Sequence, residues 1–370
     1  MFGGIRIGRL AGIPFFINPS WFFVFAFVTF SLATSSLPAW IPGEADWVYW
    51  LLGPTVAILF FGSLVAHELG HSLVSKAYGI PVRAITLHLF GGVAQLGREV
   101  RRPREEFWIA VAGPAVSVAL GALFWGSGYL LGDFLPTVAN SLVIVGILNV
   151  GVVVFNMVPG FPLDGGRVLR AAVWGAIGDY RRATKVASTA GRLVGLLLIF
   201  GGIYLAVTQG DISSLWLTIM GFFLMSIARQ SYVQAVIQDT LQKTPLSEAQ
   251  IRLIAVPGYL TLDELYAGYI STTGRQYYLV EVGERAVGVI TPYALASVPR
   301  LLWGVTPLTS VMKPLESIPE ISIASSAVAA LNRMEDSGAE MLRTLEHGRT
   351  TGVVTRDQLL RLIMRARATR

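Results

Sequence analysis

Long hydrophobic stretches separated by short polar loops fill the first two thirds of the chain. Six of them approach the roughly 20 apolar residues that a helix needs to span a bilayer. They are Trp21–Leu37, Val48–Ser75, Glu106–Leu131, Val138–Val158, Val186–Val207 and Ile212–Ala228. The first lacks a convincing small-residue cleavage site and therefore predicts an anchor rather than a signal peptide. The pattern predicts a polytopic α-helical membrane protein with six transmembrane helices.

After Gln238 the apolar runs shorten to strand length and alternate with amphipathic helical patterns. The strand-like runs are Gln276–Val282, Ala286–Thr291 and Thr351–Thr355, and the helical ones are Leu262–Tyr269, Ala327–Ser337 and Gln358–Arg367. A strand–strand–helix unit of about 60 residues occurs twice, the kind of internal repeat that indicates duplicated architecture. We therefore predict a membrane domain, 1–238, followed by a cytoplasmic α/β domain, 239–370.

Composition supports the membrane assignment. The 370 residues are 53% hydrophobic and 14% charged, whereas soluble domains carry about 25% charged residues. The absence of cysteine excludes disulfides, thiolate metal ligands and a cysteine nucleophile. The net charge of +6 raises the question of nucleic acid, but its distribution favours a lipid bilayer as the partner and no nucleic acid.

Basic residues occur on only one side of the predicted helices. They precede the first stretch and occupy the loops after the second and fourth: Arg6, Arg9, Arg98, Arg101, Arg102, Arg104, Arg167, Arg170, Arg181, Arg182 and Lys185. The alternate loops Pro38–Asp46, Gly132–Asn140 and Thr208–Asp211 contain no Lys or Arg. Because cytoplasmic loops carry the excess of Lys and Arg, we predict a multi-pass protein of the plasma or inner membrane with both termini in the cytoplasm.

The second hydrophobic stretch contains His67-Glu68-Leu69-Gly70-His71. Histidines at i and i+4 share one helix face, about 5–6 Å apart at Cβ, close enough to bind one zinc ion. Glu68 can then take a proton from water at the metal. A soluble helix can carry this pentapeptide by chance, but ionisable residues at membrane depth are costly and usually functional.

A third ligand is predicted just after the fourth stretch. The run Asn156–Arg167 contains two prolines and three glycines, which break the helix. Asp164 is the only carboxylate between Asp133 and Asp179. A catalytic zinc takes three protein ligands and keeps one open position, and a carboxylate is an accepted third ligand. Alternatively Asp164 caps a short helix, but a second inward-running helix ending on the same side as the histidines favours the ligand.

These two motifs together resemble the site-2 protease family of intramembrane zinc metalloproteases. The segments Phe90–Gln95 and Ala112–Ala115 are also similar to that family. The resemblance covers the membrane half and implies an endopeptidase that cleaves a transmembrane segment of a protein substrate near the cytoplasmic face.

The resemblance also implies roles for individual residues. One zinc per chain would be held by His67, His71 and Asp164. Glu68 would activate the attacking water, and Asn156 would hold or polarise the peptide carbonyl.

The segment Val82–Val100 alternates loosely and contains Gly91-Gly92, which predicts a hairpin dipping toward the membrane. Its exposed edge could pair with an unwound substrate, and an ordinary cytoplasmic hairpin is the alternative. His88 lies here and is interpreted as structural.

The tail resembles a tandem pair of CBS domains spanning about Pro245 to Ala366, with Val311–Leu315 opening the second. Such pairs often sense adenine nucleotides through an acidic residue three positions after a strand-end threonine. Here those positions hold Ala294 and Gln358, and Asp357 lies one position early. The tail could therefore be an adenine-nucleotide sensor or a structural module that forms a homodimer, and the sequence leaves both roles open.

Two other functions are compatible with some of these features. A transporter regulated by the CBS pair should show broken helices at matching positions near the midplane, whereas here the breaks and charges gather at one inner end. A zinc-binding scaffold without turnover would share the motifs but not depend on Glu68.

Overall fold

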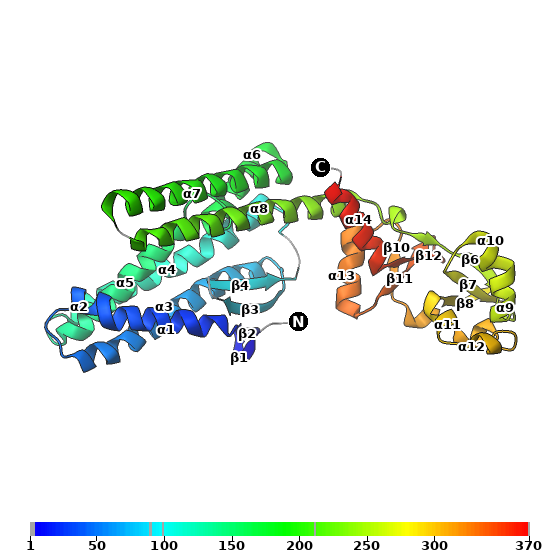
Figure 1. The fold of residues 1–370 in the computed structure, drawn as a ribbon, viewed down its shortest axis with the longest axis horizontal. Helices are drawn as coiled ribbons and strands as arrows, with labels where there is room; N and C mark the ends of the chain where they lie inside the picture. The colour runs from blue at the N-terminus through cyan, green and yellow to red at the C-terminus, as the bar shows by residue number, and fades with distance from the viewer. Residues whose placement is uncertain (1–3, 89–90, 98–99, 211, 369–370) are drawn as a thin grey trace. The chain divides into compact units, whose positions relative to one another are not determined.

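The computed structural model describes residues 4–88, 91–97, 100–210 and 212–368. It divides into two compact units, Met1–Val233 and Gln234–Arg370, each with its own elements (Figure 1). Phe90, Arg98 and Asp211, which enter the sequence predictions, lie outside the described residues.

The six predicted hydrophobic helices are all present among the described residues. The first candidate span combines α1 (Ser20–Ser31), a π-helical turn (Leu32–Ser36) and α2 (Leu37–Trp40). The others are built on α3 (Asp46–Ala77), α4 (Pro103–Leu131), α5 (Pro136–Asn156), α7 (Tyr180–Gln209) and α8 (Leu215–Lys243). Several helices extend beyond the hydrophobic stretch, because hydrogen bonding continues through polar residues that hydropathy does not count.

These helices pack closely through small residues. A Cβ added at Gly128 of α4 would lie only 2.7 Å from the Ala139 carbonyl oxygen of α5. Leu37, Val56 and Val145, on α2, α3 and α5, are fully buried in one apolar cluster. Where lipid and side chains are equally apolar, such close backbone approach is a main source of helix association.

A short amphipathic helix, α6 (Asp164–Ile177), lies between α5 and α7. The sequence indicated a broken backbone here, and the short helix that it offered as an alternative is present, with Asp164 as its first residue and no side-chain cap. It begins at Asp164 and ends at Ile177, and the next residue, Gly178, has a φ of 71°, the left-handed conformation common just after helices. The helix start therefore decides where the Asp164 side chain lies.

The membrane unit also contains a four-stranded sheet in the order β1-β2-β3-β4. Its strands are β1 (Ile5–Leu10), β2 (Ile13–Ile17), β3 (Val82–His88) and β4 (Gly91–Leu96). The predicted hairpin is confirmed as the antiparallel β3–β4 pair. The N-terminal hairpin was not predicted, and β2 joins it to β3 in parallel. Only one side of β4 is paired within the sheet, so β4 is an edge strand.

The C-terminal unit contains two four-stranded sheets, β6-β7-β8-β9 and β10-β11-β12-β5. Their strands are β5 (Ile251–Arg252), β6 (Ile254–Pro257), β7 (Tyr278–Val282), β8 (Arg285–Ile290), β9 (Lys313–Pro314), β10 (Glu320–Ser322), β11 (Met341–Glu346) and β12 (Arg349–Thr355). Helices α13 (Ala327–Ser337) and α14 (Arg356–Ala368) belong to the second half. Because β5 pairs with β12 and β9 with β8, each half supplies a strand to the other, and the predicted duplication is present.

Candidate metal centre and active site

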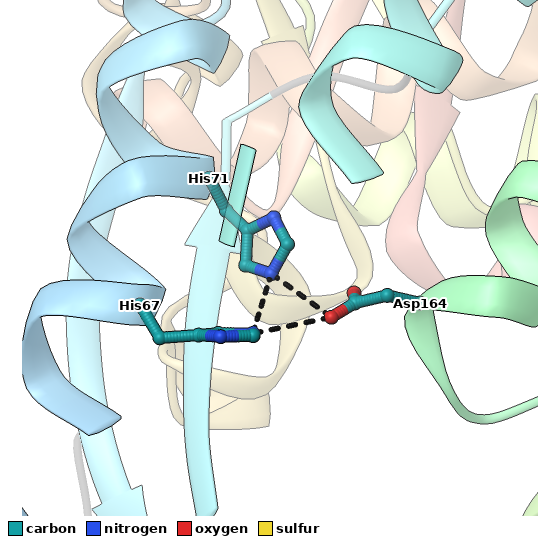
Figure 2. A group of neighbouring side chains, drawn as sticks. All are labelled: His67, His71 and Asp164. Carbon is teal, nitrogen blue, oxygen red and sulfur yellow. Dashed lines mark hydrogen bonds and ion pairs between the residues drawn. The ribbon is translucent and has the colours of Figure 1, made fainter. Parts of the chain in front are cut away.

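Three side chains distant in sequence converge inside the membrane unit. His67 and His71 project from α3, and Asp164 approaches them from the start of α6 (Figure 2). Each Nε2 atom lies 3.2 Å from the same Asp164 Oδ2, and the two Nε2 atoms are 3.1 Å apart. The structure thus brings together the three residues that the sequence suggested as metal ligands.

Glycines allow the chain to turn sharply from α5 into α6. A Cβ at Gly165 would lie 2.3 Å from the Met157 carbonyl oxygen, and one at Gly166 would lie 2.3 Å from the Gly160 carbonyl carbon. Side chains at these positions would push the two backbone segments apart. The broken segment therefore folds tightly enough to aim Asp164 at α3.

The other nitrogen of each imidazole also has a partner. His71 Nδ1 lies 2.6 Å from the Ile109 carbonyl oxygen, and His67 Nδ1 lies 2.9 Å from Ser117 Oγ, both on α4. A carbonyl only accepts, so His71 Nδ1 must donate, and the serine hydroxyl can accept from His67 in the same way. With the Nδ1 proton so fixed, each neutral imidazole directs the lone pair of Nε2 at the cluster.

Asp164 is suited to be the anionic member. It is 9% exposed, and an Arg167 guanidinium nitrogen lies 3.8 Å from its Oδ1. The positive charge of that guanidinium favours the ionised form of the Asp164 carboxylate. A carboxylate and two imidazole lone pairs directed at one point form a ligand set that fits zinc.

Space for these imidazoles depends on Gly113 of α4. A Cβ there would lie 2.3 Å from His71 Nε2 and 2.5 Å from His67 Nε2. Only a resemblance pointed to Ala112–Ala115, and the roles of Ile109 and Ser117 were not predicted. The sequence did contain a signal for them. Ile109, Gly113 and Ser117 are spaced by four residues and so share one face of a helix.

Glu68 lies next to His67 on α3, with its side chain against β4. A Cβ at Gly92 would lie 2.3 Å from Glu68 Cγ and 3.2 Å from its Oε1. The carboxylate therefore rests directly on the backbone of an edge strand. The predicted proton acceptor is thus next to His67 in the chain and against a strand that can accept a further partner.

Asn156 and His88 are the two other residues to which the sequence pointed. Asn156 is the last residue of α5, partly buried, and the next residue packs against Gly165. Its role at the carbonyl stays a prediction. His88 lies in the β3–β4 pair opposite Gly91 and is not one of the three converging side chains among the described residues.

Known proteins resemble this chain over most of its length. Residues 55–137 and 134–200 match Peptidase family M50. The protein named "Putative zinc metalloprotease sll0528" of Synechocystis sp. is 32% identical over 375 residues, covering 100% of this chain and 97% of its own. The chain belongs to peptidase family M50. "Putative zinc metalloprotease Rip3" of Mycobacterium tuberculosis is 33% identical, with 97% and 92% coverage. The predicted site-2 protease family and zinc metalloprotease class are thereby confirmed.

Two solved structures are each similar to part of this M50 peptidase. The site-2 protease from Methanocaldococcus jannaschii covers 62% of this chain and 95% of its own, with 28% identity and a TM-score of 0.44. A CBS domain of a membrane protein from Sphaerobacter thermophilus covers 37% of this chain and 97% of its own, with 19% identity and a TM-score of 0.31.

Replacing Ser117 by alanine is expected to weaken zinc binding by about 10–100-fold, the usual effect of removing a hydrogen-bond partner from a liganding histidine. His67 would lose the acceptor that fixes its Nδ1 proton. Competition with a chelator measures the affinity. Ser117→Thr, which keeps the hydroxyl, should preserve it, as should Ser141→Ala on α5, whose hydroxyl donates to the Thr137 carbonyl. Unchanged affinity in Ser117→Ala would contradict the assigned contact.

Proposed function

We propose that this membrane protein is an intramembrane zinc endopeptidase that cleaves transmembrane segments of substrate proteins near the cytoplasmic face. The observation that carries the proposal is the convergence of Asp164, at the start of α6, with His67 and His71, which lie within a helix apolar enough to cross a membrane. One zinc per chain would be held by these three residues. When bound, zinc supplies Lewis-acid polarisation of the peptide carbonyl and of water.

The protein's own groups would carry the proton transfers. Glu68 would take a proton from the water that attacks the carbonyl carbon. As the C–N bond breaks, the same carboxyl group would give that proton to the leaving nitrogen, which departs as an amine. Asn156 would donate its amide N–H to the carbonyl oxygen and hold the peptide in register.

The edge of β4 would hold the substrate in extended form. A helical substrate hides its carbonyls in internal hydrogen bonds, so it must unwind before water can attack. An edge strand offers unpaired backbone groups to such a segment. Because Gly92 of β4 touches Glu68, a peptide paired along this edge would pass close to the proton acceptor. An ordinary hairpin without a substrate role is the alternative.

The direct test is to map the cleaved bond. The purified protein is reconstituted in liposomes with a panel of single-span membrane proteins, and product masses are measured. We expect cleavage inside a transmembrane segment, in its cytoplasmic half, and none after zinc removal. Cleavage confined to soluble loops would overturn the intramembrane assignment.

We further propose a multi-pass orientation with both termini in the cytoplasm, supported by the arginine and lysine asymmetry of the loops. The chain has no cysteine, so single cysteines can be labelled without background. A Phe134→Cys variant, at a position 81% exposed between α4 and α5, should react with a membrane-impermeant maleimide from outside. Arg181→Cys, at the start of α7, should react only after the cytoplasmic face is opened. The reverse pattern would contradict this topology.

The tail would tune access to the site rather than take part in the chemistry. All proposed site residues lie at or before Asp164. Helix α8 continues to Lys243, and its Leu241 is buried in the core of the C-terminal unit with Leu246 and Ala330. A rearrangement of that core would therefore be passed along a continuous helix.

Adenine nucleotide binding to the tail is testable on the full-length protein. The two positions expected to hold ribose carry Ala294, which is buried, and Gln358. We expect ATP, ADP or AMP to alter the cleavage rate only if they also bind measurably by calorimetry. If the nucleotides neither bind nor change the cleavage rate, homodimerisation remains as the role of the tail. The mass of the protein in detergent would test that role.

A further inference from the structure

A buried ion pair lies close to the site, and the proposed chemistry does not use it. Glu106 of α4 is fully buried, and its partner Arg170 of α6 has a side chain only 15% exposed. Arg170 Nε donates to Glu106 Oε1 at 2.8 Å, and an Nη2 hydrogen bond reaches the same oxygen. Two turns of different helices are thus joined by a charged pair with little access to water.

Aromatic contacts fix the guanidinium further. Its central carbon lies 4.8 Å from the ring centres of both Phe161 and Tyr180, and Nη1 donates to the Tyr180 hydroxyl at 2.9 Å. Phe161 belongs to the broken segment before α6, and Tyr180 begins α7. A planar guanidinium can stack on rings and donate in fixed directions at the same time. Arg170 therefore connects four parts of the membrane unit.

Helix α4 is the common support for both halves of the donor set. Its Ile109 carbonyl accepts from His71, and Ser117 pairs with His67. On the same helix Glu106 holds Arg170, which lies six residues after Asp164 on α6. Six helical residues span only about 9 Å. A shift of α6 relative to α4 would move Asp164 away from the imidazoles.

Stability alone does not account for this pair. Removing two charges from water costs about as much as their attraction returns, and apolar residues of similar size often serve as well. Glu106 Oε2 is buried and has no hydrogen-bond partner among the described residues. No side chain caps the start of α6. A directional, double-donor contact is therefore an important constraint on where that helix sits.

We propose that Glu106 and Arg170 are positioning residues that hold Asp164 in register with His67 and His71. This inference rests on the proposed function, because it takes Asp164 to be a zinc ligand. Neither residue touches the donor atoms in the described contacts, so both act through the placement of α6.

Zinc affinity of the full-length protein in detergent tests the proposal. Chelator competition should show about tenfold weaker binding in Arg170→Met and in Glu106→Gln, the scale found when groups supporting a ligand are removed. Arg182→Met makes the same chemical change at a side chain that is 79% exposed on α7, and it should bind zinc like wild type. Wild-type affinity in Arg170→Met would overturn the proposal.

The deciding measurement repeats Arg170→Met in an Asp164→Asn background. If Arg170 acts through Asp164, it adds no further loss once that carboxylate is gone. An equal loss in both backgrounds would mean that the pair merely supports the fold, and the proposal would fall. Asp164→Asn alone checks the proposed function separately, since unchanged zinc affinity in that variant would remove Asp164 as a ligand.

If Arg170→Met does not fold, a milder substitution at the same position can test the proposal instead. Arg170→Lys retains the charge but loses the double donor and the ring stacking. It should weaken zinc binding in the Asp164 protein and have no effect beside Asp164→Asn. Full affinity in Arg170→Lys would show that charge alone suffices and would overturn the positioning role of the guanidinium.

Discussion

Glu68→Gln is expected to lose peptide cleavage by about 10²–10⁴-fold, the usual contribution of a general base, while zinc stays bound. Glutamine has nearly the same shape but cannot take a proton from water. The side chain contacts the Gly92 backbone and is not one of the three converging ligands, so the donor set should persist. Initial cleavage rates and zinc content, measured on the same preparation, check both halves of this expectation.

Glu105→Gln is the matched control. Glu105 precedes Glu106 on α4, its Oε1 lies 4.0 Å from Arg102 Nε, and it is not one of the three converging ligands. Its variant should cleave at the wild-type rate. Equal rates in Glu68→Gln and wild type would exclude Glu68 as the base. A zinc-loaded wild type without turnover on any substrate would instead favour a scaffold.

Much of the site could be predicted because each element of it follows from local rules. Hydrophobic length indicated the helix that carries His67 and His71, and the four-residue spacing put both on one face. The break after α5 indicated where a third ligand could enter. These signals are short-range, so they can be recognised before any tertiary packing is known.

The support around the ligands could not be predicted in the same way. Gly113, Ser117 and Glu106 matter because of how α4 is rotated against α3 and α6. A helix that is apolar all round carries little hydropathy signal for its rotation, since lipid and neighbouring helices present similar surfaces. The role of Gly113 depends on a distance to side chains more than 40 residues away in sequence.

Short elements were missed for a related reason. The strands β5 and β9 have two residues each, too few to show alternation, and they belong to the sheet of the opposite half. The N-terminal hairpin contains Pro14 and Gly8, which obscure a strand pattern. Pairing with β3 stabilises it, and that partner is distant in sequence.

Gly113→Ala is expected to weaken zinc binding on the order of a hundredfold, the upper range for changes that disturb liganding histidines. The new methyl group would lie 2.3 Å from His71 Nε2 and 2.5 Å from His67 Nε2, well inside contact distance. One imidazole would have to rotate away, and its lone pair would leave the cluster. Zinc content and chelator competition measure the loss.

Helix propensity predicts that the same substitution stabilises α4, so a loss of zinc affinity could not be explained by a weakened helix. Within a helix, alanine is favoured over glycine by roughly 0.5–1 kcal/mol, so α4 itself should not be weakened. Gly121→Ala is the control on the same helix, because its Cβ would meet the Gly146 carbonyl oxygen at 3.4 Å, an ordinary contact. It should retain zinc and helicity by circular dichroism. If Gly113→Ala kept wild-type zinc affinity, the imidazoles could not lie against α4 as described, and the donor set would need a different arrangement.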